Sequence, residues 1–327
     1  MKKLSSKHPL DKMEASLKRF IKESINRIPA AYRYFQGKEK NILLFSSRRG
    51  GSSILAQLLS ANPFIREIDQ PFDINLKNDV ESSTKIKRLP SKMHSQFLSL
   101  NEEEKQIVEN YISRLLKGEI PEIKKYIIAN RTVLKIVNAF PLMDYLADLT
   151  KADIIYLSRH PVAQSLSVIQ NKWEFTSEAF LADPVFAGNY LTQLQIDLGH
   201  DVIRQGTLLE KGVLNWCLEN LYPLKFCKSE MLHITYEDLI LNKEPVLQMM
   251  NEKLRISKVE KLHRILSKPS RSSYLSDKSS VEAISKGNSN ALVQKWIPRL
   301  HENEKKAVQK ILDVFEINLY NAYDALP

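Results

Sequence analysis

The feature that most constrains the fold is a short apolar run that leads through a glycine- and serine-rich segment into an amphipathic pattern. The run "NILLF" (41–45) predicts a buried strand, and "SSRRGGSSILAQLL" (46–59) ends with the apolar spacing of a helix. A tight strand-to-helix turn directs several backbone N–H groups and the positive end of the helix dipole at one point. We therefore expect an anion, and most simply a phosphate group, to bind at this turn.

The residue types in the turn fit that expectation. Two glycines allow the backbone to approach a ligand closely, two serines add hydroxyl donors at the helix start, and two arginines add charged donors. These residues are Arg48, Arg49, Gly50, Gly51, Ser52 and Ser53. The segment lacks the lysine of the G-x-x-x-x-G-K-[ST] motif, which disfavours an NTPase that binds a magnesium nucleotide.

The rest of the chain alternates between strand and helix patterns, which predicts an α/β fold with a parallel sheet. Further strands are expected at 132–137, 153–158 and 231–235, and helices at 101–117, 141–149, 161–171, 212–226 and near the C-terminus. Residues 174–204 have weak periodicity. Residues 78–100 read as a loop or variable cap, and the Ser- and Lys-rich segment 268–291 is expected to be mobile.

A second group of polar residues follows the strand predicted at 153–158. Arg159 stands at its carboxyl end, and Ser167 lies eight residues later, in the first turns of the next helix. Ligands of open α/β sheets bind outside the carboxyl ends of the strands. We therefore expect these two residues to belong to the same site as the glycine turn.

The charge of the chain points to an anionic partner, and much of it is local. The 327 residues have a formal net charge of +10, and residues 1–40 contain eleven Lys or Arg against four acidic residues. Residues 12–28 predict a basic amphipathic helix, which either packs on the domain or lies on an anionic membrane surface.

The chain has no nucleic-acid reader motif, so nucleic acid is not expected as a partner. A signal peptide and a membrane span are also not recognised, and the expected location is cytoplasmic, with peripheral membrane contact through this helix as the alternative.

The two polar groups together resemble the nucleotide-binding signatures of the sulfotransferases that use 3′-phosphoadenosine-5′-phosphosulfate (PAPS). "SSRRGGSSILAQLL" is similar to their 5′-phosphosulfate loop, and "IIYLSRHPVAQSLS" to their 3′-phosphate motif, with His160 in place of the usual Asp. An Arg in the loop is more similar to the carbohydrate and tyrosylprotein branches than to the cytosolic branch. The resemblance implies a single domain over 41–327, after a basic extension over 1–40, with a P-loop-like parallel central sheet flanked by helices. It also implies PAPS as cofactor and no metal.

The resemblance also implies roles for single residues. Lys135, in "TVLKIV", matches the strand lysine near the transferring sulfuryl group, and Tyr236, in "ITYEDL", matches a tyrosine near the adenine. Lys286 is expected in a basic segment that closes over the nucleotide. The cytosolic-type histidine is replaced by Val137, so the candidate base is a carboxylate after the first helix.

We expect that base to be Asp69, because it stands in "REIDQPFDI", next to the slot that holds a Glu in other branches. The further candidates are Asp73, Glu67 and, in the 78–100 loop, His94.

The function expected from the resemblance is transfer of the sulfuryl group of PAPS to a hydroxyl or amine. The acceptor is expected to be a small molecule or a glycan, with a glycan or lipid-linked sugar favoured by the arginine in the loop. Two alternatives stay open at this point. One is an atypical P-loop kinase, and the other is a non-enzymatic module that binds anionic membranes.

Overall fold

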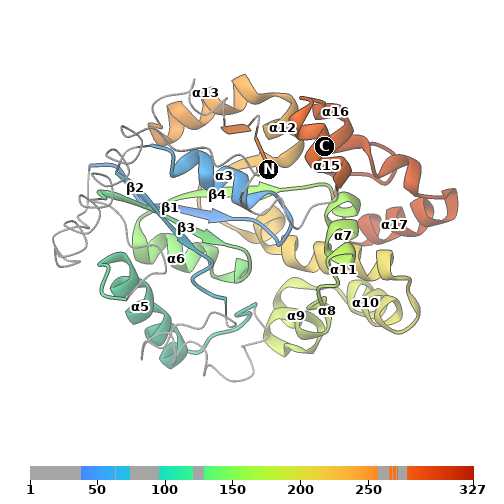
Figure 1. Ribbon diagram of the computed structural model, residues 1–327. Coiled ribbons are helices and arrows are strands. Elements are labelled where there is room, and N and C mark those ends of the chain that lie inside the picture. The colour runs from blue at the N-terminus through green and yellow to red at the C-terminus, as the bar shows by residue number, and fades with distance from the viewer. Residues whose placement is uncertain are drawn as a thin grey trace, which may run out of the picture.

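The fold is built on a central parallel sheet (Figure 1). The computed structural model describes residues 38–62, 64–73, 96–120, 129–256, 265–266, 268–269, 271 and 278–327. Within them the strands are β1 (Ile42–Phe45), β2 (Ile65–Asp69), β3 (Arg131–Ile136), β4 (Asp153–Ser158) and β5 (Met231–Thr235). Their order across the sheet is β2-β3-β1-β4-β5, and each neighbouring pair is parallel. The turn that follows β1 therefore lies at the middle of the carboxyl edge.

Helices account for most of the other described residues. They are α3 (Ser52–Leu59), α5 (Glu102–Leu116), α6 (Met143–Thr150), α7 (Pro161–Gln170), α8 (Ser177–Ala182), α9 (Pro184–Tyr190), α10 (Gln193–Gln205), α11 (Leu208–Leu221), α12 (Tyr236–Leu241), α13 (Lys243–Leu254), α15 (Lys278–Ser285), α16 (Ser289–Gln294) and α17 (Glu302–Val314). A 3₁₀ turn over Phe140–Leu142 leads into α6, another covers Ile297–Arg299, and a π-helical turn over Tyr222–Phe226 extends α11.

The strands predicted from the sequence are confirmed, and the structure adds elements that were not predicted. Strand β2 was not predicted, because Arg66, Glu67 and Asp69 interrupt its apolar pattern. The segment 268–291, expected to be mobile, contains α15 and the start of α16. The Ser- and Lys-rich composition hides the apolar face of these helices, since Ala283 is buried and Ile284 and Ala291 pack against the same core cluster. The helix expected at 12–28 lies outside the described residues.

Both faces of the sheet are covered, which explains why the central strand β1 is apolar throughout. Leu43 and Phe45 of β1 pack with side chains of α5 and α6 on one face. Ile42 and Leu44 alternate with them and pack against α3, α12 and α13 on the other face. In Figure 1 the helices α3, α12 and α13 lie above the sheet, and α5 and α6 lie below it.

A third cluster of buried side chains lies beside the sheet and joins helices far apart in the sequence. Trp216 and Leu218 of α11 pack with residues of α7, α8, α10, α16 and α17. The region with weak periodicity, 174–204, supplies three helices to this bundle. Two of them have only six and seven residues, which is too short to show a clear helical period.

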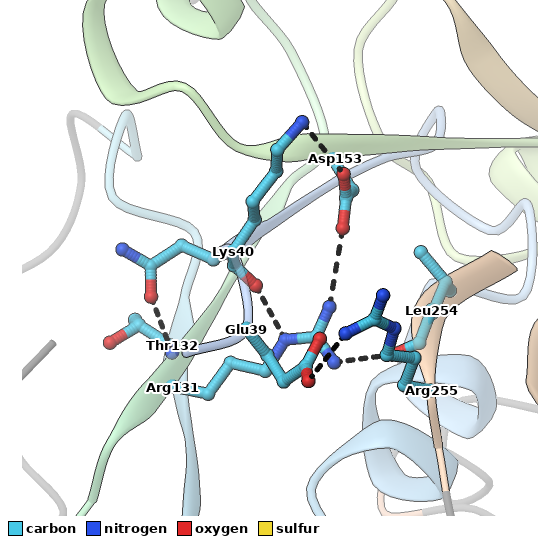
Figure 2. Close-up of polar contacts among 8 residues, drawn as sticks. Glu39, Lys40, Arg131, Thr132, Asp153, Leu254 and Arg255 are labelled. Carbon is cyan, nitrogen blue, oxygen red and sulfur yellow. Dashed lines mark hydrogen bonds and ion pairs between the residues drawn. The ribbon is translucent and has the colours of Figure 1, made fainter. Parts of the chain in front are cut away.

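The amino edge of the sheet is held by a buried arginine (Figure 2). The side chain of Arg131, at the start of β3, is 3% exposed and lies 3.3 Å from a carboxylate oxygen of Asp153. Its guanidinium also donates to the carbonyl oxygens of Lys40 and Leu254. Burial lowers the pKa of Arg131, and the charge of Asp153 opposes that effect. This cluster ties β3, β4 and the end of α13 together at the edge opposite the glycine turn.

Candidate active site

The glycine turn has a conformation that only small residues accept. Gly51 has φ +103°, and a Cβ there would lie 2.5 Å from Cδ2 of Tyr236. A Cβ on Gly50 would lie 2.8 Å from the carbonyl oxygen of Ser47. Arg49, between them and β1, has φ +66°, a value uncommon for a residue with a side chain. Helix α3 begins at Ser52, so its first N–H groups, which have no partner within the helix, face out of this turn.

Buried polar side chains of α11 and β4 support the start of the glycine turn through hydrogen bonds. The Nδ2 of Asn220 donates to the Oγ of Ser47 over 3.1 Å. The hydroxyl of Tyr156 donates to Oδ1 of the same asparagine over 2.7 Å. Glu219, also buried, accepts a hydrogen bond from Gln96, and burial raises the pKa of its carboxyl. These contacts fix the start of the turn relative to the sheet.

The second polar group converges on the first, as the strand ends predicted. The Nε of Arg49 donates to the Oγ of Ser167 over 3.0 Å. The Nη1 of Arg159 donates to the carbonyl oxygen of Arg49 over 3.0 Å. The two sequence motifs, more than a hundred residues apart, therefore form one surface.

The side chain of Arg159 lies against the aromatic ring of Tyr236. Its guanidinium carbon lies 4.5 Å from the centre of the Tyr236 ring, close enough for a cation–π contact. Burial raises the pKa of the Tyr236 hydroxyl, and the charge of Arg159 opposes that effect. The Nε of Arg159 is buried and has no hydrogen-bond partner among the described residues. A donor in this state is costly unless a ligand accepts from it.

His160, at the position where the motif that it resembles usually has an Asp, is a buried structural residue. Its Nδ1 accepts a hydrogen bond from the amide of Val162 and so caps α7, and its Nε2 lies 2.9 Å from the carbonyl oxygen of Asn321. The ring stacks on Trp296 with a centroid distance of 4.3 Å. Burial lowers the pKa of His160 to about 4, so the ring is neutral at neutral pH. A neutral ring that accepts at Nδ1 carries its proton on Nε2, which donates to Asn321.

Lys135 and Asp69 form an ion pair at the β2–β3 end of the site. Their Nζ and Oδ1 atoms lie 2.6 Å apart, and the two residues are register partners in the parallel β2–β3 pair. The lysine side chain is 4% exposed and that of the aspartate 44%. A buried ammonium and an accessible carboxylate therefore stand side by side, which was not foreseen from the sequence.

These residues share a cavity of about 500 Å³ at the carboxyl edge of the sheet. Of the residues singled out in the sequence, Arg48, Arg49, Gly51, Ser52, Ser53, Asp69, Lys135, Arg159, Ser167 and Tyr236 line it. Gly50 lies in the turn itself. Asp69 is the only acidic side chain among the described residues that line the cavity, so its interior is strongly positive.

Several expected residues lie away from the cavity. Lys286 is exposed after the end of α15, although its neighbour Gly287 lines the cavity. Glu67 is in an ion pair with Arg271. Asp73 does not line the cavity, and His94 lies outside the described residues.

Five basic residues and one tryptophan of the cavity wall were not expected from the sequence. They are Trp173, Lys243, Lys268, Arg271, Lys295 and Arg299. The guanidinium carbons of Arg48 and Arg49 lie 5.7 and 5.8 Å from the centre of the Trp173 ring. The spacing of these residues along the chain contains no motif. The signal that could have found some of them is the density of basic residues around Trp296.

The site offers charge and hydrogen-bond donors rather than metal ligands. No group of three or more His, Cys, Asp or Glu side chains that could hold a metal ion occurs in the described parts of the chain. In the same parts, none of the helices combines the length and the apolar character needed to cross a bilayer.

Comparison with known proteins identifies the family. The model of the sulfotransferase domain matches residues 39–322. Among curated proteins, none matches. Similar solved structures include mouse sulfotransferase SULT7A1 complexed with PAP, at 16% identity, 88% coverage of each chain and a TM-score of 0.44. The sulfotransferase domain of the Synechococcus PCC 7002 olefin synthase has 17% identity, with 88% of this chain and 99% of that one covered and a TM-score of 0.44.

The sulfotransferase domain of the curacin biosynthetic pathway has 14% identity, with 86% of this chain and 99% of that one covered and a TM-score of 0.42. The family model, which spans most of the residues, carries the assignment. The chain belongs to the sulfotransferase domain family and is a transferase of that family.

Proposed function

We propose that this protein transfers the sulfuryl group of PAPS to a hydroxyl or amine of an acceptor. The observation that carries the proposal is the convergence of Arg49, Arg159 and Ser167 at the carboxyl edge of the sheet. A ligand with phosphate groups at both ends of a nucleoside needs two such anion sites within one cavity. A kinase that binds magnesium nucleotides would need the loop lysine that this turn lacks.

The residues present fit such a donor. The turn at Gly50 and Gly51 has no room for a Cβ, and Gly51 lines the cavity, so the backbone there can approach a ligand closely. The buried Nε of Arg159 needs an acceptor, and a phosphate oxygen would supply one. The positive cavity favours a polyanion, because the charges lie partly out of water.

Each end of the donor has its own set of residues in this proposal. Arg49, the amides of the turn and the hydroxyls of Ser52 and Ser53 hold the 5′-phosphosulfate. Arg159 and Ser167 hold the 3′-phosphate, and Tyr236 lies beside the adenine, as the family resemblance implies. When bound, PAPS supplies a sulfuryl group on a bisphosphate leaving group.

The chemistry at the β2–β3 end follows from the ion pair. Lys135 places a positive charge where negative charge develops during transfer, which is the largest single contribution in many group-transfer enzymes. Asp69 is accessible from the cavity and accepts the proton that the acceptor loses. Because both side chains come from adjacent strands, their relative position is fixed before the acceptor binds.

The acceptor in this proposal is a small molecule or a glycan, with a glycan or lipid-linked sugar preferred. Incubation with labelled PAPS and fractionated lysate, followed by identification of the labelled product, tests the acceptor.

We also propose a cytoplasmic location, with residues 1–40 making peripheral contact with anionic membranes. Vesicle association at low and high salt, with and without residues 1–37, tests the membrane contact.

Ligand-dependent thermal unfolding tests the donor site directly. At 100 times its dissociation constant, 3′,5′-adenosine bisphosphate should stabilise the protein by about 2.7 kcal/mol. ATP with Mg²⁺ serves as the competing ligand. Stabilisation by the bisphosphate alone supports the proposal, and stabilisation by ATP with Mg²⁺ alone contradicts it.

A further inference from the structure

The peptide bond between Arg159 and His160 is clamped at both of its polar atoms. Its carbonyl oxygen accepts a hydrogen bond from Nε1 of Trp216 over 2.9 Å. Its N–H donates to Oε1 of Glu237 over 3.0 Å. The donor and the acceptor are both buried side chains, from α11 and α12 respectively. The plane of this peptide, and with it the direction in which the Arg159 side chain leaves the backbone, is therefore fixed from two sides.

Glu237 connects this peptide with the aromatic ring beneath the arginine. It directly follows Tyr236, whose ring lies 4.5 Å from the guanidinium of Arg159. The carboxylate is 2% exposed, and its two oxygens have different partners. Oε1 accepts from the amide of His160, and Oε2 accepts from the hydroxyl of Tyr320 over 3.0 Å. The side chain of Glu237 thus binds the peptide that follows the arginine, and its backbone directly follows the tyrosine of the cavity wall.

Tyr320 brings the C-terminal segment into this arrangement. Besides Glu237, its hydroxyl lies 3.2 Å from the Oγ of Ser158, the last residue of β4. Its ring makes an edge contact with His160, and the next residue, Asn321, accepts the hydrogen bond from His160 Nε2. Among the described residues, none after Arg299 lines the cavity. The segment therefore contacts the residues behind the cavity wall rather than the cavity.

We propose that Glu237 and Tyr320 are positioning residues for nucleotide binding, holding Arg159 and Tyr236 in the orientation that receives the 3′-phosphate end of the donor. The inference rests on the proposed function for the identity of the ligand. Burial raises the pKa of Glu237, and the His160 amide, Arg159 and Tyr320 oppose that effect. The carboxyl group has its two oxygens committed to the clamp and is not free for proton transfer.

The central test compares two tyrosine-to-phenylalanine variants with matched chemistry. Tyr320→Phe removes the hydroxyl that holds Glu237 and keeps the ring. Tyr222→Phe removes a hydroxyl that donates to the carboxylate of Asp144 over 2.7 Å, in a different cluster of the core. Loss of a hydrogen bond to a charged group typically changes an equilibrium by about tenfold. We expect Tyr320→Phe to weaken binding of 3′,5′-adenosine bisphosphate by about that factor and Tyr222→Phe to leave it unchanged, although both lower the melting temperature.

Conservative replacement of the carboxylate separates geometry from charge. Glu237→Gln retains an oxygen for the His160 amide and a group that can pair with Tyr320, so we expect bisphosphate affinity within about twofold of the parent protein. Glu237→Ala leaves the amide of His160 without its acceptor, and we expect at least about a tenfold loss. In steady-state assays the loss should appear in KM for PAPS, with kcat nearly unchanged, because neither residue lines the cavity.

The outcomes separate this inference from the proposed function. If the parent protein binds the bisphosphate and Tyr320→Phe binds it equally well, the positioning role is wrong and the proposed function stands. If the parent protein does not bind the bisphosphate, the proposed function is wrong. Hydrogen exchange at the His160 amide then still decides whether the clamp exists. Faster exchange in Tyr320→Phe than in Tyr222→Phe supports the clamp, and equal exchange overturns it.

Discussion

Acid should destabilise this protein through His160. The ring is fully buried, and its Nδ1 must stay unprotonated to accept from the amide of Val162. Burial lowers the pKa of the ring from 6.5 to about 4, with Arg159 acting in the same direction. Below about pH 6.5 His160 binds a proton in the unfolded chain but not in the folded protein. The free energy of unfolding therefore falls as the pH falls toward 4.

The magnitude follows from the two pKa values. Between about pH 7.5 and about pH 5 this one group should remove about 2 kcal/mol from the free energy of unfolding. Above about pH 7.5 its contribution should be constant, because the ring is then neutral in both states. The matched variant is His160→Asn, whose side-chain oxygen can still cap α7 but does not titrate.

Urea unfolding followed by tryptophan fluorescence provides the assay. The parent protein and His160→Asn are compared at the two pH values, so that effects of other titrating groups, such as Asp144, Glu219 and His233, cancel in the difference. The variant starts less stable, because it loses the stacking on Trp296, but its stability should fall less on acidification. An identical loss in both proteins would refute the assignment of the neutral, buried ring.

Three further predictions follow from the site and from the amino edge. Gly51→Ala should lower bisphosphate affinity by at least about tenfold and lower the melting temperature, because the new Cβ would meet the Tyr236 ring; unchanged binding would contradict the tight turn. Asp69→Asn should lower kcat by about 100-fold or more and leave bisphosphate affinity unchanged, and a fully active variant would exclude Asp69 as the base. Arg131→Met should reduce the free energy of unfolding by about 3 kcal/mol in urea titrations, with bisphosphate affinity intact, whereas a loss of binding at equal stability would show a link between the two edges of the sheet.

The part of the site predictable from the sequence is the part built on strand ends. Arg49 and Arg159 follow β1 and β4, which are neighbours in the sheet, so their meeting follows from a parallel topology alone. Ser167 was expected from its position eight residues after Arg159, in the helix that follows β4. These positions follow from local sequence patterns, which do not depend on how the side chains pack.

The residues that escaped prediction depend on long-range geometry. The pairing of Lys135 with Asp69 requires the register of β2 against β3, and β2 itself is disguised by its charged residues. Trp173 reaches the cavity only because the helix α7 ends where it does, and Lys295 only because α16 packs beside α12. The expected role of Lys286 shows the same limit, since a basic motif does not specify which of several nearby cations turns inward.

The two charged clusters of this molecule occupy opposite ends of the same strands. Strand β4 begins at Asp153, beside Arg131, and ends at Ser158, next to Arg159, so the clusters are separated by the length of a six-residue strand, about 20 Å. At that distance two unit charges interact by only about 1 kcal/mol at an effective dielectric constant of about 20. The two edges are therefore only weakly coupled electrostatically. A substitution that changes stability at Arg131 should therefore leave turnover nearly unchanged, and a polyanion that binds at the other edge should leave the pair of Arg131 and Asp153 in place.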